Sequence, residues 1–245
     1  MLLLRQPPRP KGWEPIPNMS PFCVKLETYL RLAKVPYEIR FGDPRKAPKG
    51  KIPFIEDGDV RMGDSGLIVD YLKGKYGDPL DAHLNVEEKA RLLTIRRMIE
   101  EHTYFCMLHL RWSSEESWPY VRDFFLPFLP KGIGGLIMRQ VRKQVLSRAH
   151  HQGVGRHSRA EITALAKSDI DAYATLLGDK AYFLGDRPTS LDATMFGFLV
   201  NAMKTPWPCD VKVHALSKPN LVAYLDRMLA TYWADEFGAY VSKNA

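Results

Sequence analysis

The residues best suited to chemistry form the segment Ser20-Pro21-Phe22-Cys23. A serine directly before a proline is typical of a helix N-cap and its first helical residue, and apolar side chains recur at helical spacing after it. A helix N-terminus has unpaired N–H groups and a partial positive charge, so it favours an anion such as a thiolate. A hydroxyl that donates to the sulfur lowers the thiol pKa further. We therefore expect Ser20 to stabilise a ligand thiolate, with plain capping of the helix as the alternative.

A second segment, Gly50-Lys51-Ile52-Pro53, places a proline inside a strand-like run. Proline cannot donate to a sheet ladder, so this run is not a regular central strand. A cis peptide before Pro53 would turn the chain and leave the backbone N–H and C=O of Ile52 free for a peptide-like ligand. A trans proline on an edge strand is the alternative.

A third segment, Asp64-Ser65, precedes an amphipathic helical pattern. The backbone N–H and the hydroxyl of Ser65 could bind a carboxylate at the positive end of that helix, with capping alone as the alternative. Later in the chain, Thr189 and Asp192 have the spacing of a capping box. We interpret that pair as fixing a helix rather than doing chemistry.

The first third of the sequence must position these segments, and it alternates between strand and helix patterns. Helical spacing begins near Phe22 and again near Leu67. Strand-like runs occur at 2–5, 37–41, 52–55 and 60–62. This order predicts an α/β domain, which we place at residues 1–77.

The rest of the chain contains no convincing strand alternation. Helical patterns follow one another, and the pattern at 193–203 is apolar on all sides, which predicts a buried core helix. We therefore predict an all-helical domain at residues 85–245, joined to the first domain through the short segment between them.

The composition excludes several classes of protein. The cysteines, Cys23, Cys106 and Cys209, are too few and too scattered for a disulfide framework or a structural zinc site, and we expect no metal. No apolar run approaches the roughly 20 residues of a membrane helix, and the N-terminus does not resemble a signal peptide. We expect a cytoplasmic protein without a membrane span.

The net charge of the chain is +7, and the sequence contains no nucleic-acid-binding motif. These two observations favour a solvated basic surface and no nucleic-acid partner.

In their order and spacing, the segments quoted above resemble the glutathione transferase superfamily over nearly the whole chain. More narrowly, residues 20–30 and 185–194 resemble the branch that contains the metaxins and the Fax-type (failed axon connections) proteins. The resemblance implies the two-domain glutathione transferase fold, in which a thioredoxin-like domain with a mixed four-stranded sheet precedes a bundle of helices.

The resemblance also implies a role for each quoted residue of the first domain. Ser20 would donate a hydrogen bond to the sulfur of glutathione. Ile52, before a cis-Pro53, would pair with the backbone of the tripeptide. Asp64 and Ser65 would hold its γ-glutamyl group.

Two further assignments follow from the resemblance. Lys51, or else Lys49, would meet the glycine carboxylate of glutathione. The first long helix of the second domain would border the pocket for an electrophile, which makes Tyr104, Arg111 and Trp112 candidates to contact that substrate. One buried and one solvated helix face is the alternative for these three side chains.

The function implied by the resemblance is conjugation of glutathione, as a co-substrate, to a hydrophobic electrophile. One alternative is a non-catalytic adaptor that binds a protein through its surface, including the basic helix at 139–148. Another is a glutathione-dependent thiol reductase, against which the serine at position 20 counts, because a dithiol mechanism would need cysteine there. We expect Cys23 to be a small buried hydrophobe rather than a nucleophile. Homodimers are common in the superfamily, so we also expect a homodimer.

Overall fold

The computed structural model describes residues 1–244 of the chain, and the side chains of residues 1–240. Its first part is a four-stranded sheet with the strand order β2-β1-β3-β4. β1 pairs with β2 in parallel, whereas β3 is antiparallel to both β1 and β4. The elements of this part are β1 (Leu2–Gln6), α1 (Pro21–Leu32), β2 (Tyr37–Phe41), β3 (Phe54–Asp57), β4 (Val60–Gly63) and α2 (Ser65–Tyr76). The predicted mixed sheet is confirmed.

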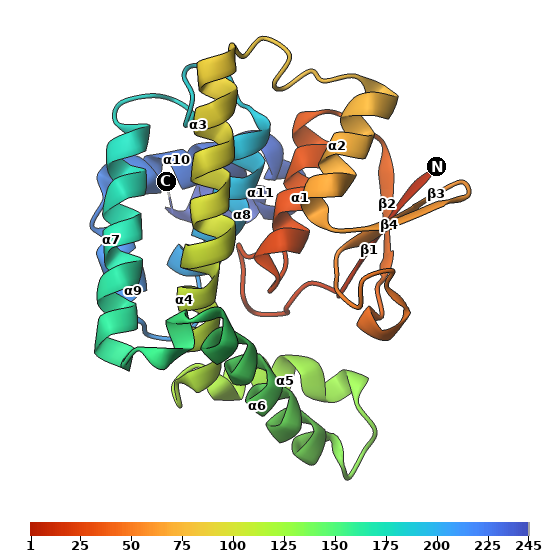
Figure 1. Ribbon diagram of the computed structural model, residues 1–245, viewed down its shortest axis with the longest axis vertical. Helices are drawn as coiled ribbons and strands as arrows, with labels where there is room; N and C mark the ends of the chain where they lie inside the picture. Colours follow the sequence, from red (N-terminus) through yellow and green to blue (C-terminus); the bar gives the residue numbers. More distant parts are fainter. Residues whose placement is uncertain (245) are drawn as a thin grey trace.

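The second part is helical, and Figure 1 shows α1 and α2 lying between it and the sheet. Its helices are α3 (Val86–Arg97), α4 (Tyr104–Ser113), α5 (Trp118–Phe125), α6 (Gly134–Gln152), α7 (Arg159–Leu177), α8 (Ser190–Met203), α9 (Asp210–Leu216), α10 (Pro219–Tyr232) and α11 (Ala234–Asn244). Between residues 86 and 244 the strand-like pairing is limited to one isolated bridge, Tyr182 to Gly185. Within the described residues, none of the helices has both the length and the hydropathy needed to span a bilayer.

The long helical pattern that the sequence predicts from 87 to 112 is not one α-helix. A π-helical segment, Met98–Thr103, joins α3 to α4. Such segments insert a wider turn into a helix and are frequent at functional sites. The π-helical segment contains Glu100, whose acidic side chain points inward and which is only 8% exposed.

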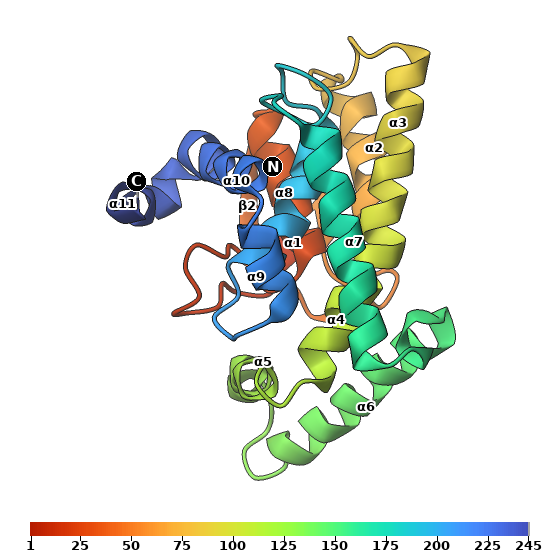
Figure 2. The same cartoon turned by 90° about the vertical axis from the view of Figure 1, so that its left-hand side faces the viewer.

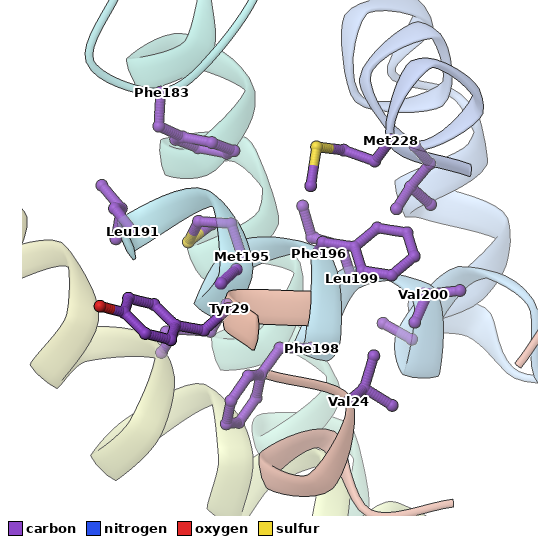
Figure 3. Close-up of a cluster of buried hydrophobic side chains, with 14 of the residues drawn as sticks. Val24, Tyr29, Phe183, Leu191, Met195, Phe196, Phe198, Leu199, Val200 and Met228 are labelled. Atoms are coloured by element: carbon purple, nitrogen blue, oxygen red, sulfur yellow. The ribbon is translucent and has the colours of Figure 1, made fainter. Parts of the chain in front are cut away.

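The predicted core helix is α8, and every one of its residues is buried. Figure 3 shows its side chains packed between α1 and α10, with Val24 and Tyr29 on one side and Met228 on another. Its N-terminus is fixed by the predicted capping box, in which Asp192 Oδ2 accepts from the backbone N–H of Thr189 at 2.8 Å. Burial on all sides explains why the helix carries no polar face.

The long loop between β1 and α1 is packed rather than open. Trp13, Ile16 and Met19 form a buried cluster with Trp207, and the rings of Trp13 and Trp207 meet edge to face at 5.3 Å. Figure 2 shows this loop beside the segment that precedes α9. The helical part therefore anchors the chain just before α1 begins.

The two parts approach each other very closely where α8 crosses the start of α1. A Cβ atom added at Gly197 would lie 2.7 Å from the carbonyl oxygen of Pro21 and 2.8 Å from the backbone nitrogen of Lys25. Real Cβ atoms do not approach backbone this closely, so only glycine fits at this position. Gly197 thus sets how near the first turn of α1 lies to the core helix.

We predict that Gly197→Ala lowers the free energy of unfolding by at least about 2 kcal/mol, because the added methyl group must displace backbone rather than a flexible side chain. Gly74→Ala is the matched control, since Gly74 lies exposed in α2 and its Cβ would meet nothing within 4 Å. There, alanine should raise stability by about 0.5–1 kcal/mol. Urea unfolding of the three proteins measures both changes, and equal effects at the two glycines would contradict the packing argument.

Candidate functional site

Ser20 is the N-cap of α1 and is half-buried rather than covered by packed side chains. Its Oγ accepts a long hydrogen bond, 3.4 Å, from the backbone N–H of Cys23. The Ser20 N–H donates to the side-chain oxygen of Asn18 at 3.0 Å. The hydroxyl therefore caps the helix as an acceptor, and it also lies within hydrogen-bond reach of the Cys23 thiol. Because burial keeps that thiol protonated, the hydroxyl proton can turn to a stronger acceptor such as a ligand thiolate.

Two residues of the helical part hold the backbone that leads to Ser20. Arg111, in α4, donates to the carbonyl oxygen of Met19 at 2.7 Å and to Asn201 Oδ1 at 3.1 Å. Asn201, in α8, donates to the carbonyl oxygen of Asn18 at 3.1 Å. The sequence analysis did not identify Asn201. Its amide in a mostly apolar helix was nevertheless a signal, because a buried amide must find hydrogen-bond partners.

The Ile52–Pro53 peptide is cis, as the resemblance implies. β3 begins at Phe54, so Ile52 lies outside the ladder. In the described part of the chain, neither the N–H nor the C=O of Ile52 has a backbone partner. Lys51 is exposed beside it, and Lys49 lies near Gly63 at the end of β4.

Asp64 and Ser65 begin α2, as predicted. Asp64 is the N-cap, and its Oδ1 accepts from the N–H groups of Gly66 and Leu67 at 2.9 and 3.1 Å. Its φ is +82°, in the region that favours glycine, and holding a non-glycine residue there costs about 1–3 kcal/mol. Such strained positions cluster at ligand-binding sites.

Ser65 is buried, and a lysine that sequence reasoning missed holds its hydroxyl. Lys25 Nζ, 3% exposed, donates to Ser65 Oγ at 3.2 Å and to Glu100 Oε1 at 2.5 Å. Burial lowers the pKa of the Lys25 ammonium, and the nearby Glu100 carboxylate opposes that shift. The ion pair joins α1 to the π-helical segment and places a cation against Ser65. A lysine in the first two turns of an apolar helix was the signal that could have predicted this buried ion pair.

The three candidates for the electrophile pocket lie in different places. Tyr104 is half-buried and packs edge to face on Phe22, with the ring centroids 4.9 Å apart, so it lies beside the first turn of α1. Burial raises the pKa of its phenol, which therefore stays protonated at neutral pH. Arg111 is buried behind Met19, as described above. Trp112 faces α5 and α6, in a cluster with Val121.

The Cys23 thiol is poorly placed for redox chemistry. Cys23 is fully buried, and burial raises the pKa of its thiol to about 12, so it is not a ready thiolate. Among the described residues, no three His, Cys, Asp or Glu side chains come together in a way that could hold a metal ion.

Comparison with known proteins adds family evidence to this geometry. Residues 21–117 match the model of the glutathione S-transferase N-terminal domain, and residues 166–228 match that of the C-terminal domain. β-Etherase LigF from Sphingobium sp. strain SYK-6 has a TM-score of 0.62 at 14% identity and covers 100% of this chain and 99% of its own. At that identity the likeness concerns the fold alone, and it confirms the predicted glutathione transferase fold.

Sequence relatives extend over most of the chain. The isoprene-epoxide–glutathione S-transferase of Rhodococcus sp. (strain AD45) is 33% identical over 228 residues, which cover 89% of this chain and 94% of that protein. Failed axon connections of Drosophila melanogaster is 28% identical over 232 residues, which cover 87% of this chain but only 54% of that longer protein. Metaxins are further relatives, so the resemblance to this branch is confirmed. The chain therefore belongs to the glutathione S-transferase family.

Proposed function

We propose that the protein binds glutathione and transfers its thiolate to a small hydrophobic electrophile. The observation that carries this proposal is the half-buried hydroxyl of Ser20 at the N-terminus of α1. Because Ser20 Oγ accepts from the Cys23 N–H, its proton can point toward a ligand sulfur. The helix N-terminus and this proton both favour the thiolate over the thiol.

The rest of glutathione would bind along the edge that Ile52, Asp64 and Ser65 share. The unpaired N–H and C=O of Ile52 suit the backbone of the cysteinyl residue. Ser65, with Lys25 behind it, suits the α-carboxylate of the γ-glutamyl group. Exposed Lys51 would meet the glycine carboxylate.

We propose an epoxide as the first electrophile class to test, because a relative at 33% identity is named for one. Opening an epoxide with a thiolate leaves an alkoxide, which needs a proton. Tyr104 lies beside the first turn of α1, and its phenol is protonated at neutral pH, so it has a proton to give to the strongly basic alkoxide. Tyr104 would thus act as the general acid.

An adaptor role is the second candidate, favoured by the Fax relative and by the exposed basic side chains of α6, Arg139, Lys143 and Arg148. Calorimetric titration separates the two functions. An adaptor without a glutathione site would give no binding heat at millimolar glutathione.

The buried thiol of Cys23 argues against the reductase alternative. A homodimer remains part of the proposal, to be tested by sedimentation.

We predict that Ser20→Ala raises the pKa of the bound glutathione thiol by about one unit or more, because one hydrogen bond to the thiolate is lost. The conjugation rate at neutral pH should fall about tenfold, while the dissociation constant of glutathione changes less than about twofold. Ultraviolet absorbance of the thiolate against pH gives the pKa directly.

The matched control for that variant is Ser158→Ala. Ser158 is likewise the N-cap of α7 and accepts from the N–H of Glu161 at 3.3 Å, but it lies on the exposed surface and also donates to the Glu161 carboxylate at 2.7 Å. It should lose a similar amount of stability and leave the thiol pKa unchanged. A Ser20→Ala protein that conjugates at the parental rate would remove Ser20 from the mechanism.

We predict that Lys25 positions the Ser65 hydroxyl for the γ-glutamyl carboxylate. Removing the lysine alone leaves the buried Glu100 carboxylate with only the more distant Arg96 guanidinium, 4.0 Å away, at a cost of up to about 3–5 kcal/mol. The double variant Lys25→Met, Glu100→Met removes both charges and should fold. It should bind glutathione about tenfold more weakly than the parent, whereas cysteinylglycine, which lacks the γ-glutamyl group, should bind equally to both. Equal losses for the two ligands would show a general disturbance instead.

We predict that Tyr104→Phe slows conjugation to an epoxide by about tenfold to a hundredfold, because the alkoxide loses its proton donor. Conjugation to an activated aryl chloride should be nearly unchanged, since chloride leaves without a proton. Steady-state rates with both substrates on one preparation make the comparison. A parallel loss on both substrates would mean that Tyr104 shapes the pocket without donating.

A further inference from the structure

The guanidinium of Arg111 is a buried cation without an acidic partner. The side chain is 8% exposed, and no carboxylate in the described part of the chain lies within 4.0 Å of it. Its hydrogen bonds go to the neutral oxygens of Met19 and Asn201, and its guanidinium lies 5.5 Å from the ring centroid of Trp207. A buried charge is costly unless it is paired with an opposite charge.

Arg111 also lines a small pocket of about 50 Å³. α4, α7, the end of α8 and the start of α9 line it, so it lies on the side of α4 that faces away from the sheet (Figure 1). Asn201 and Trp207 contribute to the same wall as Arg111. A volume of this size holds a few water-sized groups, which suits a small ion better than an electrophile or a peptide.

A second unpartnered group lines this pocket. Thr205 is 4% exposed, and its Oγ1 has no hydrogen-bond partner among the described residues. A buried hydroxyl without a partner is destabilising. Asp210 supplies the one acidic side chain among the lining residues, and it is exposed at the rim. Arg159, also in the lining, is exposed and lies 3.6 Å from the carboxylate of Glu116, so Arg111 is the one buried cation of the lining.

We propose that this pocket binds a small monovalent anion of the size of chloride. An anion beside Arg111 offsets the buried charge, and it also accepts the hydroxyl proton of Thr205. A water molecule would satisfy the hydroxyl but leave the cation unpaired. The site is separate from the proposed glutathione site, because no residue assigned to glutathione lines it. It is joined to that site only through Arg111, which also holds the carbonyl oxygen before Ser20.

The first test is diffraction from crystals grown or soaked in sodium bromide. We expect an anomalous peak in the pocket, in contact with the Arg111 guanidinium and with Thr205 Oγ1. Density for water with no anomalous signal there would overturn the proposal.

The second test is thermal unfolding at constant ionic strength, with chloride replaced stepwise by gluconate, which is too large for the pocket. An anion that binds only the folded state raises the melting temperature with its concentration. We expect chloride to stabilise the parent protein, and Thr205→Val to weaken its apparent affinity about tenfold. Arg111→Met, if folded, should abolish the dependence on chloride.

The control is Thr175→Val on the exposed face of α7, where the hydroxyl donates to the carbonyl oxygen of Asp171. This variant should keep the chloride dependence of the parent. Melting temperatures that do not respond to chloride in the parent, or respond equally in Thr205→Val, would overturn the assignment of these two residues to an anion site.

Discussion

The contact on which the rest of the structure depends is the crossing of α8 over the first turn of α1 at Gly197. With no side chain there, the backbone of Pro21 and Lys25 lies directly against the core helix. α8 is buried along its whole length, and α1 is the helix that it contacts most extensively. The start of α1, and Ser20 with it, is therefore placed by packing from the second half of the chain and not by the sheet alone.

Polar side chains of the helical part also hold the start of α1 in place. Arg111 and Asn201 reach from the helical part to the carbonyl oxygens of Met19 and Asn18, and Glu100 reaches to Lys25. Each of these groups is buried, so a mismatch would leave an unpaired polar atom or charge at a cost of a few kcal/mol. Such contacts add little net stability, but they tolerate only one relative placement of α1, α4 and α8.

Local patterns predicted the sheet, α1, α2 and the core helix, because each has a periodicity or a turn signal of its own. They did not predict α9, which is only seven residues long and buries few side chains, or α11 at the end of the chain. The π-helical segment was also missed, since α-helical spacing cannot show which residue a wider turn rotates inward. Lys25, Glu100 and Asn201 take their roles from partners far away in the sequence, which a local pattern does not contain.

The two serines of the candidate site show why a structural role and a chemical role are not competing explanations. Ser20 Oγ accepts from a backbone N–H, and Ser65 Oγ accepts from the Lys25 ammonium. In each case a protein donor occupies a lone pair of the oxygen, while the hydroxyl proton is left for another acceptor. A hydroxyl held in this way can act as a donor toward an anion, and in the proposed function the Ser20 hydroxyl would face a sulfur and the Ser65 hydroxyl a carboxylate. The structural role therefore prepares the chemical one, and a test must measure ligand ionisation or ligand selectivity, because loss of stability accompanies both.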